Sequence, residues 1–137
     1  MSTIARFEDL VAWQKARIFN KLVSKATKNE GIKNDFRLVA QWRASSGSVM
    51  DNIAEGFDRQ GNKEFIQFLS IARGSLGEAQ SQTYRVLDQG CISEAEFKEI
   101  YDSSLEVKKL IDSLIGYLKN SEIKGLKYKK DTVRGTG

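Results

Sequence analysis

The sequence predicts an all-α protein, an antiparallel up-down bundle of four helices. Its 137 residues include no proline, the commonest helix breaker, so long uninterrupted helices are favoured. Four segments repeat apolar or small residues at alternating spacings of three and four, and short polar turns separate them. Helices of this length that are joined by short loops pack antiparallel. We expect the bundle domain to occupy residues 1–120 and a basic, disordered tail to occupy residues 121–137.

The first helix is expected from about Phe7 to Thr27, and a turn over residues 29–34 follows it. Asn34 or Asp35 can cap the next helix, because short polar side chains accept hydrogen bonds from its first free amides. The apolar stripe predicted for the first helix consists of Phe7, Val11, Ile18 and Leu22, with Leu10, Trp13 and Phe19 beside it.

The second helix is expected from about Phe36 to Phe57. It ends in a polar loop over residues 58–61, after which Asn62 is a candidate cap. Its core seam is predicted to be Val39, Trp42, Ser46, Val49, Ile53 and Gly56.

The third helix is expected over about residues 63–89, with Gly90 as the stop just beyond it. Its predicted seam is Phe65, Leu69, Ala72, Leu76, Ala79, Thr83 and Val86. The fourth helix opens at Ser93, and Glu96 three residues later completes a capping box. We expect this helix to fade near Ser121. Its predicted seam is Phe97, Ile100, Ser104, Val107, Ile111, Leu114 and Leu118.

The composition argues against an enzyme. The chain contains no histidine, so Ser-His and Cys-His nucleophile pairs, di-iron sites and the usual zinc sites are all excluded. Its single cysteine, Cys91, cannot form an intramolecular disulfide and fits a reducing compartment. We therefore expect no catalysis, no metal and no cofactor. One catalytic alternative stays open, a metal-dependent hydrolase that uses Asp51, Glu55 and Glu78, and only carboxylate spacing suggests it.

No targeting or membrane segment is visible in the sequence. Residues 1–6 have no apolar region of the kind a secretory signal needs. No apolar run approaches the roughly 18 residues of a membrane span. We expect a cytoplasmic protein.

The positive charge predicts a nucleic-acid ligand. The net charge is +4, of which the tail from Ser121 carries +3, so the preceding bundle is nearly neutral. A basic tail is either a solvated end or an arm that contacts phosphates. The residues expected to contact phosphates are Arg43, Arg59, Lys63 and Arg73 in the bundle and Lys127, Lys129, Lys130 and Arg134 in the tail.

Small residues inside the second and third helices predict close helix packing. Gly47 lies in a stripe of short side chains on the second helix, and Gly74 and Gly77 lie in another on the third. Glycine inside a helix costs about 1 kcal/mol against alanine, and close approach of another backbone offsets that cost. The stripes either let these two helices pack within one chain or receive a second subunit.

Three motifs resemble a known family. Residues 7–16 are similar to its opening F-x-D-L-x-x-W-Q-x-A, and residues 48–59 to its S-I-x-x-N-I-A-E-G-x-x-R. Residues 65–78 contain the third, F-L-x-x-A-x-G-S-L-x-E. The chain thus resembles, over about residues 7–118, the four-helix-bundle proteins encoded by intervening sequences in bacterial 23S ribosomal RNA genes. It departs where the family often has a second basic residue after Arg43, which weakens the case for an RNA contact there.

The resemblance implies a cytoplasmic homo-oligomer, with a five-fold ring favoured from related bundles. Those relatives include the accessory subunit of diversity-generating retroelements, which binds a reverse transcriptase and nucleic acid. The polar motif residues are expected to form either a structural network or a ligand contact: Ser48, Asn52, Glu55, Ser75 and Glu78. The leading hypothesis is a non-catalytic oligomer that binds RNA or DNA. The alternative is a scaffold or accessory subunit for a partner enzyme such as a reverse transcriptase.

Overall fold

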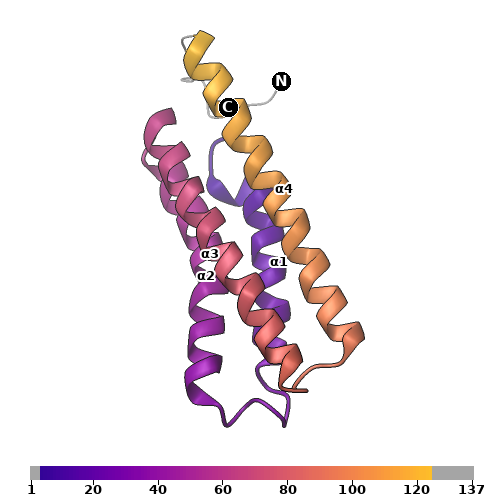
Figure 1. Ribbon diagram of the computed structural model, residues 1–137. Coiled ribbons are helices and arrows are strands. Elements are labelled where there is room, and N and C mark those ends of the chain that lie inside the picture. The colour runs from indigo at the N-terminus through magenta and orange to yellow at the C-terminus, as the bar shows by residue number, and fades with distance from the viewer. Residues whose placement is uncertain (1–3, 125–137) are drawn as a thin grey trace.

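Four helices form the predicted antiparallel bundle in the computed structural model, which describes residues 4–124 (Figure 1). A short 3₁₀ helix η1 (Phe7–Asp9) precedes α1 (Val11–Ala26), α2 (Phe36–Asp58), α3 (Asn62–Asp88) and α4 (Glu94–Lys124). Each helix packs against the next along the chain, and α4 closes the bundle against α1. The face formed by α1 and α2 is therefore opposite the face formed by α3 and α4.

The first helix differs from the prediction in its start and in its buried face. Leu10 is extended, with φ −76° and ψ 125°, so η1 and α1 are separate elements. Val11 and Ile18, expected in the core, are 52% and 47% exposed. The buried row consists of Ala12, Ala16, Phe19, Val23 and Ala26. The prediction was wrong for Val11 and Ile18, because it counted the large aliphatic residues and left out alanine, whose small side chain brings α1 close to its neighbours. It was right for Leu10 and Phe19, which are buried.

The other three seams are confirmed in their main residues. All seven predicted positions of α3 are buried. On α2 the prediction holds except that Val39 is half-buried and the neighbouring Leu38 takes its place in the core. On α4 the two half-buried positions, Phe97 and Leu114, pack against the buried cluster. Large apolar residues at regular spacing thus identified the core of these helices.

Most predicted helix ends are confirmed. The Asp35 carboxylate accepts a hydrogen bond from the Leu38 amide at 3.2 Å, and Gly90 follows α3 with φ 74°. The Ser93 and Glu96 groups bond reciprocally at 3.0 and 2.8 Å, as a capping box requires. Asn62 is not a cap, however.

Asn62 is the first residue of α3, and its side chain donates to the Leu118 carbonyl at 3.4 Å. The fourth helix continues to Lys124, past the expected end near Ser121.

Close packing between α2 and α3 occurs at Gly56. A Cβ added there would lie 2.6 Å from Phe68 Cβ and 3.1 Å from Phe65 Cδ1. At Gly74 and Gly77 an added Cβ would meet no atom within 4 Å, and both residues are exposed. Of the two alternatives for these glycines, packing within one chain is contradicted, because they lie on the outward face of α3. Their assignment to packing between subunits stays a prediction.

Candidate nucleic-acid interface

The basic residues predicted in the bundle do not form one cluster. Arg43 lies in the first half of α2, whereas Arg59 follows its last residue. Sixteen residues of helix separate them by about 24 Å along the axis. Lys63 is the second residue of α3, and Arg73 lies near the middle of that helix. All four side chains are exposed, but they belong to different parts of the surface. Lys127, Lys129, Lys130 and Arg134 lie outside the described residues.

Two of these four are held by carboxylates. Arg59 Nη2 lies 2.9 Å from Glu55 Oε2, and its guanidinium lies 5.0 Å from the centre of the Phe68 ring. Arg73 bonds both carboxylate oxygens of Asp112, with Nε at 2.5 Å and Nη2 at 3.4 Å. The hydrogen bond that Arg73 donates to Asp112 raises the pKa of Arg73 above its ordinary value. A phosphate would have to compete with these carboxylates.

A stronger concentration of positive charge lies on α1 and the first half of α2. Residues 10–29 contain five Lys or Arg and no Asp or Glu, and residues 36–50 contain two Arg and again no acid. The two segments are neighbours, because Ser46 Oγ donates to Asn20 Oδ1 at 3.0 Å. We call the exposed cations on their outer side the basic face: Arg17, Lys21, Lys28, Arg37 and Arg43.

The remaining two lysines of α1 face α4 and are partly neutralised there. Lys15 Nζ lies 3.6 Å from Glu106 Oε2. The pKa of Glu96 is lowered, chiefly by the hydrogen bond from the Ser93 amide, and the nearby ammonium of Lys25 contributes. By contrast, no carboxylate within the described part of the chain forms an ion pair with a residue of the basic face.

Short side chains lie between the cations of the basic face. Ala40 and Gly47 follow Phe36 at helical spacing, and an added Cβ at Gly47 would lie 3.8 Å from Asn20 Oδ1 of α1. Two short residues thus alternate with Arg43 along this side of α2. A polyanion can approach such a surface closely, since no acidic side chain repels it and no bulky one blocks it.

The sequence contained the signal for this face. The acid-free runs over residues 10–29 and 36–50 are visible without a structure, but the net charge of the bundle concealed them. The acidic residues are concentrated elsewhere, for example on the first half of α4. That the two runs lie side by side became apparent only from the packing of α1 against α2.

Three of the five predicted network residues meet between α2 and α3. The hydroxyls of Ser48 and Ser75 lie 2.9 Å apart, and Asn52 Nδ2 donates to the Ser48 carbonyl at 2.8 Å and to its hydroxyl at 2.9 Å. Glu55 instead pairs with Arg59, as above, while Glu78 accepts from Gln82 Nε2 at 3.3 Å. The network therefore joins helices and consists of neutral groups.

Further polar pairs continue this contact between α2 and α3 into the core. Trp42 Nε1 donates to Thr83 Oγ1 at 3.1 Å, and Thr83 donates in turn to the Ala79 carbonyl at 2.7 Å. The Ser45 hydroxyl donates to Gln82 Oε1 at 2.5 Å. Each of these buried groups has a partner, so they fix the register of the two helices and leave no free group for a ligand.

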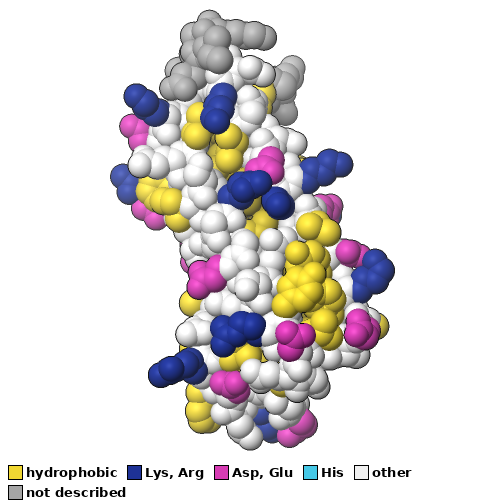
Figure 2. Space-filling view, viewed as in Figure 1, with side chains coloured by type: hydrophobic (Ala, Val, Ile, Leu, Met, Phe, Trp, Pro, Cys, Tyr) yellow, Lys and Arg dark blue, Asp and Glu magenta, His cyan; other side chains and the backbone are white. Residues whose placement is uncertain are grey.

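The opposite face of the bundle is chemically different. Figure 2 shows hydrophobic side chains gathered over the first half of α4, while Lys and Arg side chains elsewhere on this face stand near Asp and Glu. Tyr84, Phe97 and Tyr101 form an aromatic cluster with ring centres 4.9–5.3 Å apart. Tyr84 and Leu105 are 47% and 46% exposed. This aromatic patch, defined as Tyr84, Phe97, Tyr101 and Leu105, adjoins the exposed glycines of α3.

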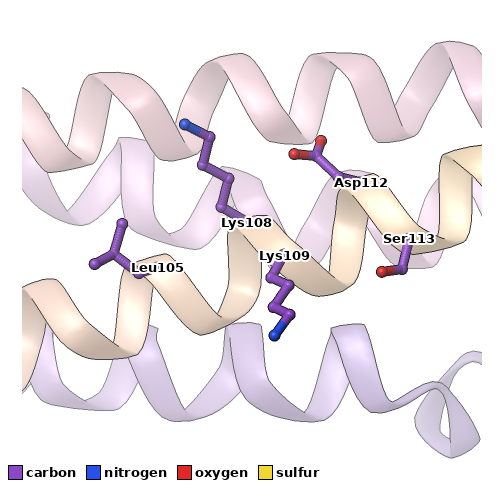
Figure 3. A pocket seen from close by; sticks show the side chains of 5 residues that line it. All are labelled: Leu105, Lys108, Lys109, Asp112 and Ser113. Carbon is purple, nitrogen blue, oxygen red and sulfur yellow. The ribbon is translucent and has the colours of Figure 1, made fainter.

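A surface hollow of about 470 Å³ lies on α4, lined by Leu105, Lys108, Lys109, Asp112 and Ser113. Its two lysines point to opposite sides of the helix, and Asp112 points to the same side as Lys108 (Figure 3). Asp112 also holds Arg73. Because Lys108 and Lys109 point in opposite directions, they cannot bind one phosphate together. The basic face is therefore the better candidate for a polyanion.

Two further findings concern the described residues, 4–124. They contain no group of three or more His, Cys, Asp or Glu side chains placed to hold a metal ion. None of their helices combines the length and the apolar character needed to cross a membrane.

Comparison with known proteins gives one family and a related fold. The model of the 23S rRNA-intervening sequence protein family matches residues 8–113. A crystal structure from Bacteroides thetaiotaomicron VPI-5482, described as a protein of unknown function from the S23 ribosomal protein family, is similar with a TM-score of 0.70. The two sequences are 26% identical, and the similarity covers 77% of this chain and 98% of that chain. No curated protein matches.

Proposed function

The chain belongs to the family of 23S rRNA-intervening sequence proteins, and on this premise we propose that it is a non-catalytic, homo-oligomeric protein that binds RNA or DNA. The resemblance seen in its three motifs is thereby confirmed at the level of the family. The crystal structure similar to it has no known function. The proposed activity therefore rests on the chain's own surface.

The basic face carries the proposal. Four exposed cations on adjacent helices and a fifth, Lys28, in the turn after α1, with no acid in either segment, create a positive potential that a nearly neutral bundle would otherwise lack. When Lys and Arg side chains of such a surface neutralise phosphates, they displace the counterions condensed on the nucleic acid, and the release of these ions drives association. The tail residues Lys127 and Lys129 would add further phosphate contacts if the tail acts as an arm.

A titration at two salt concentrations tests this function. We expect the full chain to bind a labelled RNA or DNA oligonucleotide at 50 mM salt and to lose about 10- to 1,000-fold in affinity at 200 mM, as three to six phosphate contacts require. Fluorescence anisotropy measures both constants. Absence of binding at low salt, or an affinity that salt does not change, would contradict the proposal.

Self-association is proposed through the face of α3 and α4. Gly74 and Gly77 leave two positions on the outward side of α3 without side chains, and Tyr84 of the aromatic patch lies about two helical turns beyond Gly77. Bare backbone next to exposed aromatic rings allows a helix of a second copy to pack closely. Because this face is opposite the basic face, both can be occupied at once. A ring of five copies remains the favoured assembly from the resemblance.

Gly77→Arg is expected to dissociate the oligomer. The long charged side chain would fill the space that a second copy must enter, while nothing within one chain obstructs it. Light scattering after size-exclusion chromatography should show a multiple of 15.4 kDa for the natural chain and 15.4 kDa for the variant. Ala44→Arg, the same charge added to the exposed small stripe of α2, is the matched control and should leave the mass unchanged. Dissociation by the control variant alone would place the interface on α2 instead.

A second candidate function is that of an accessory subunit for a partner enzyme such as a reverse transcriptase. The aromatic patch supports it, because exposed aromatic clusters are enriched at protein interfaces. A pull-down from cells with and without nuclease separates the two functions. Recovery of one enzyme after nuclease treatment supports the accessory role, whereas loss of every partner on nuclease treatment argues for nucleic-acid binding.

A further inference from the structure

Phe36 is the most exposed large hydrophobic residue of those that the structure describes. Its side chain is 76% exposed, compared with 52% for Val11, the next in order. It is the first residue of α2, and the core contact of that turn comes from Leu38, which is 1% exposed. The helix end is already capped by Asp35. Phe36 therefore serves neither the core nor the cap.

The surroundings of Phe36 are basic. Arg37 follows it directly, and Phe36, Ala40, Arg43 and Gly47 lie along one side of α2 at spacings of four, three and four. Gly47 faces Asn20 of α1, which places this side of α2 next to α1. Phe36 thus lies at the N-terminal end of a row on α2 that contains Arg43 and runs beside α1.

The nearby acids are engaged elsewhere. Asp35 Oδ1 accepts from the Leu38 amide, and Glu30 Oε2 lies 3.0 Å from Lys33 Nζ. The first acid of α2 is Asp51, which lies fifteen residues, or about 22 Å of helix, beyond Phe36. A phosphate chain that follows α2 from residue 50 back to Phe36 therefore meets no acidic residue of that helix.

We propose that Phe36 is a stacking platform for an unpaired base and that the ligand of the basic face is single-stranded nucleic acid. This inference rests on the proposed function. Proteins that bind single strands combine a positive groove for the backbone with exposed aromatic rings on which bases stack. A base within a duplex is already stacked on its neighbours, so its faces are not available to an exposed ring. The cations contact phosphates in either ligand, but the ring gains a contact only with a single strand.

Phe36→Ala is expected to lower the affinity for a single strand by about 5- to 100-fold, the range that loss of one stacked base produces. Its affinity for a blunt duplex should stay within about twofold. The probes are a labelled uridine 15-mer and a labelled 15-base-pair RNA duplex, each titrated with the full chain. Phe36→Tyr should retain the single-strand affinity, because it keeps an aromatic face. Ile71→Ala, which shortens a 48% exposed residue of α3, is the control and should change neither affinity.

The outcomes separate this inference from the proposed function. An unchanged single-strand affinity in Phe36→Ala, with tight binding by the natural chain, would overturn the stacking role alone. Equal losses for both probes would show that the ring does not distinguish them and would also overturn it. Failure of the natural chain to bind either probe at low salt would refute both the function and this inference. In Phe36→Trp, quenching of the new indole fluorescence by the single strand but not by the duplex is the expected direct sign of stacking.

Discussion

Arg17→Glu, Lys21→Glu and Arg43→Glu together are expected to lower nucleic-acid affinity by at least about 100-fold at low salt. Each reversal removes a phosphate contact and places a negative charge within reach of the polyanion. Loss of three contacts should also reduce the magnitude of the slope of log affinity against log salt concentration by about 2 to 3. The fold should persist, because all three side chains are exposed and none forms an ion pair within the described residues. Anisotropy titrations at several salt concentrations measure both effects.

The control for this variant changes the net charge equally at other places. Lys63→Glu, Lys109→Glu and Lys119→Glu reverse three exposed lysines of α3 and α4. If position matters, this triple should lose much less affinity than the first. Equal losses would mean that only the net charge of the protein governs binding and that no particular face is the site. Lys63 was among the residues predicted from the sequence to contact phosphates, so a small loss of affinity in this control would also argue against that prediction.

Gly56→Ala is expected to lower the free energy of unfolding by about 1–3 kcal/mol, the usual cost of inserting a methyl group into a tightly packed contact. The added Cβ would lie 2.6 Å from Phe68 Cβ, which is too short for two carbon atoms that are in non-bonded contact. Phe68 Cβ is fixed to the backbone of α3, so relief requires the two helices to separate. Urea unfolding, followed by circular dichroism, measures the change.

Gly116→Ala is the matched control for that change. Gly116 lies inside α4, is exposed, and would place its Cβ in open space. Replacing an exposed helical glycine by alanine stabilises the folded chain by about 0.5–1 kcal/mol, because the unfolded chain loses conformational freedom. The two variants should therefore shift stability in opposite directions. A Gly56→Ala protein as stable as the natural one would contradict the close contact between α2 and α3.

The sequence predicted the candidate site less well than the fold. It identified Ser48, Asn52 and Ser75 as a polar group, and the structure brings these three together. The pair of Glu55 with Arg59 depends on the helix alone, because residues four apart on a helix are neighbours whatever the tertiary structure. That any of these residues contacts a nucleic acid stays a prediction, as do the homo-oligomer and the relation to retroelement accessory subunits.

What the sequence determined by itself is the helices, their ends and most of their buried seams. These depend on interactions within a few residues: the absence of proline, the capping box at Ser93, and the recurrence of large apolar residues once per turn. On α1 the apolar periodicity did not predict the buried face, because alanine is compatible with either the core or the surface. Only the packing of the neighbouring helices decides which side of α1 is buried.

The tertiary structure alone decided which charges are free. Asp112 holds Arg73 from 39 residues away, and Glu106 pairs with Lys15 although 91 residues separate them. Arg17 and Lys21 form no ion pair within the described residues. The physical reason is that an ion pair requires contact within about 4 Å. The net charge of a segment does not reveal such contacts, because they arise only when helices distant in sequence pack side by side.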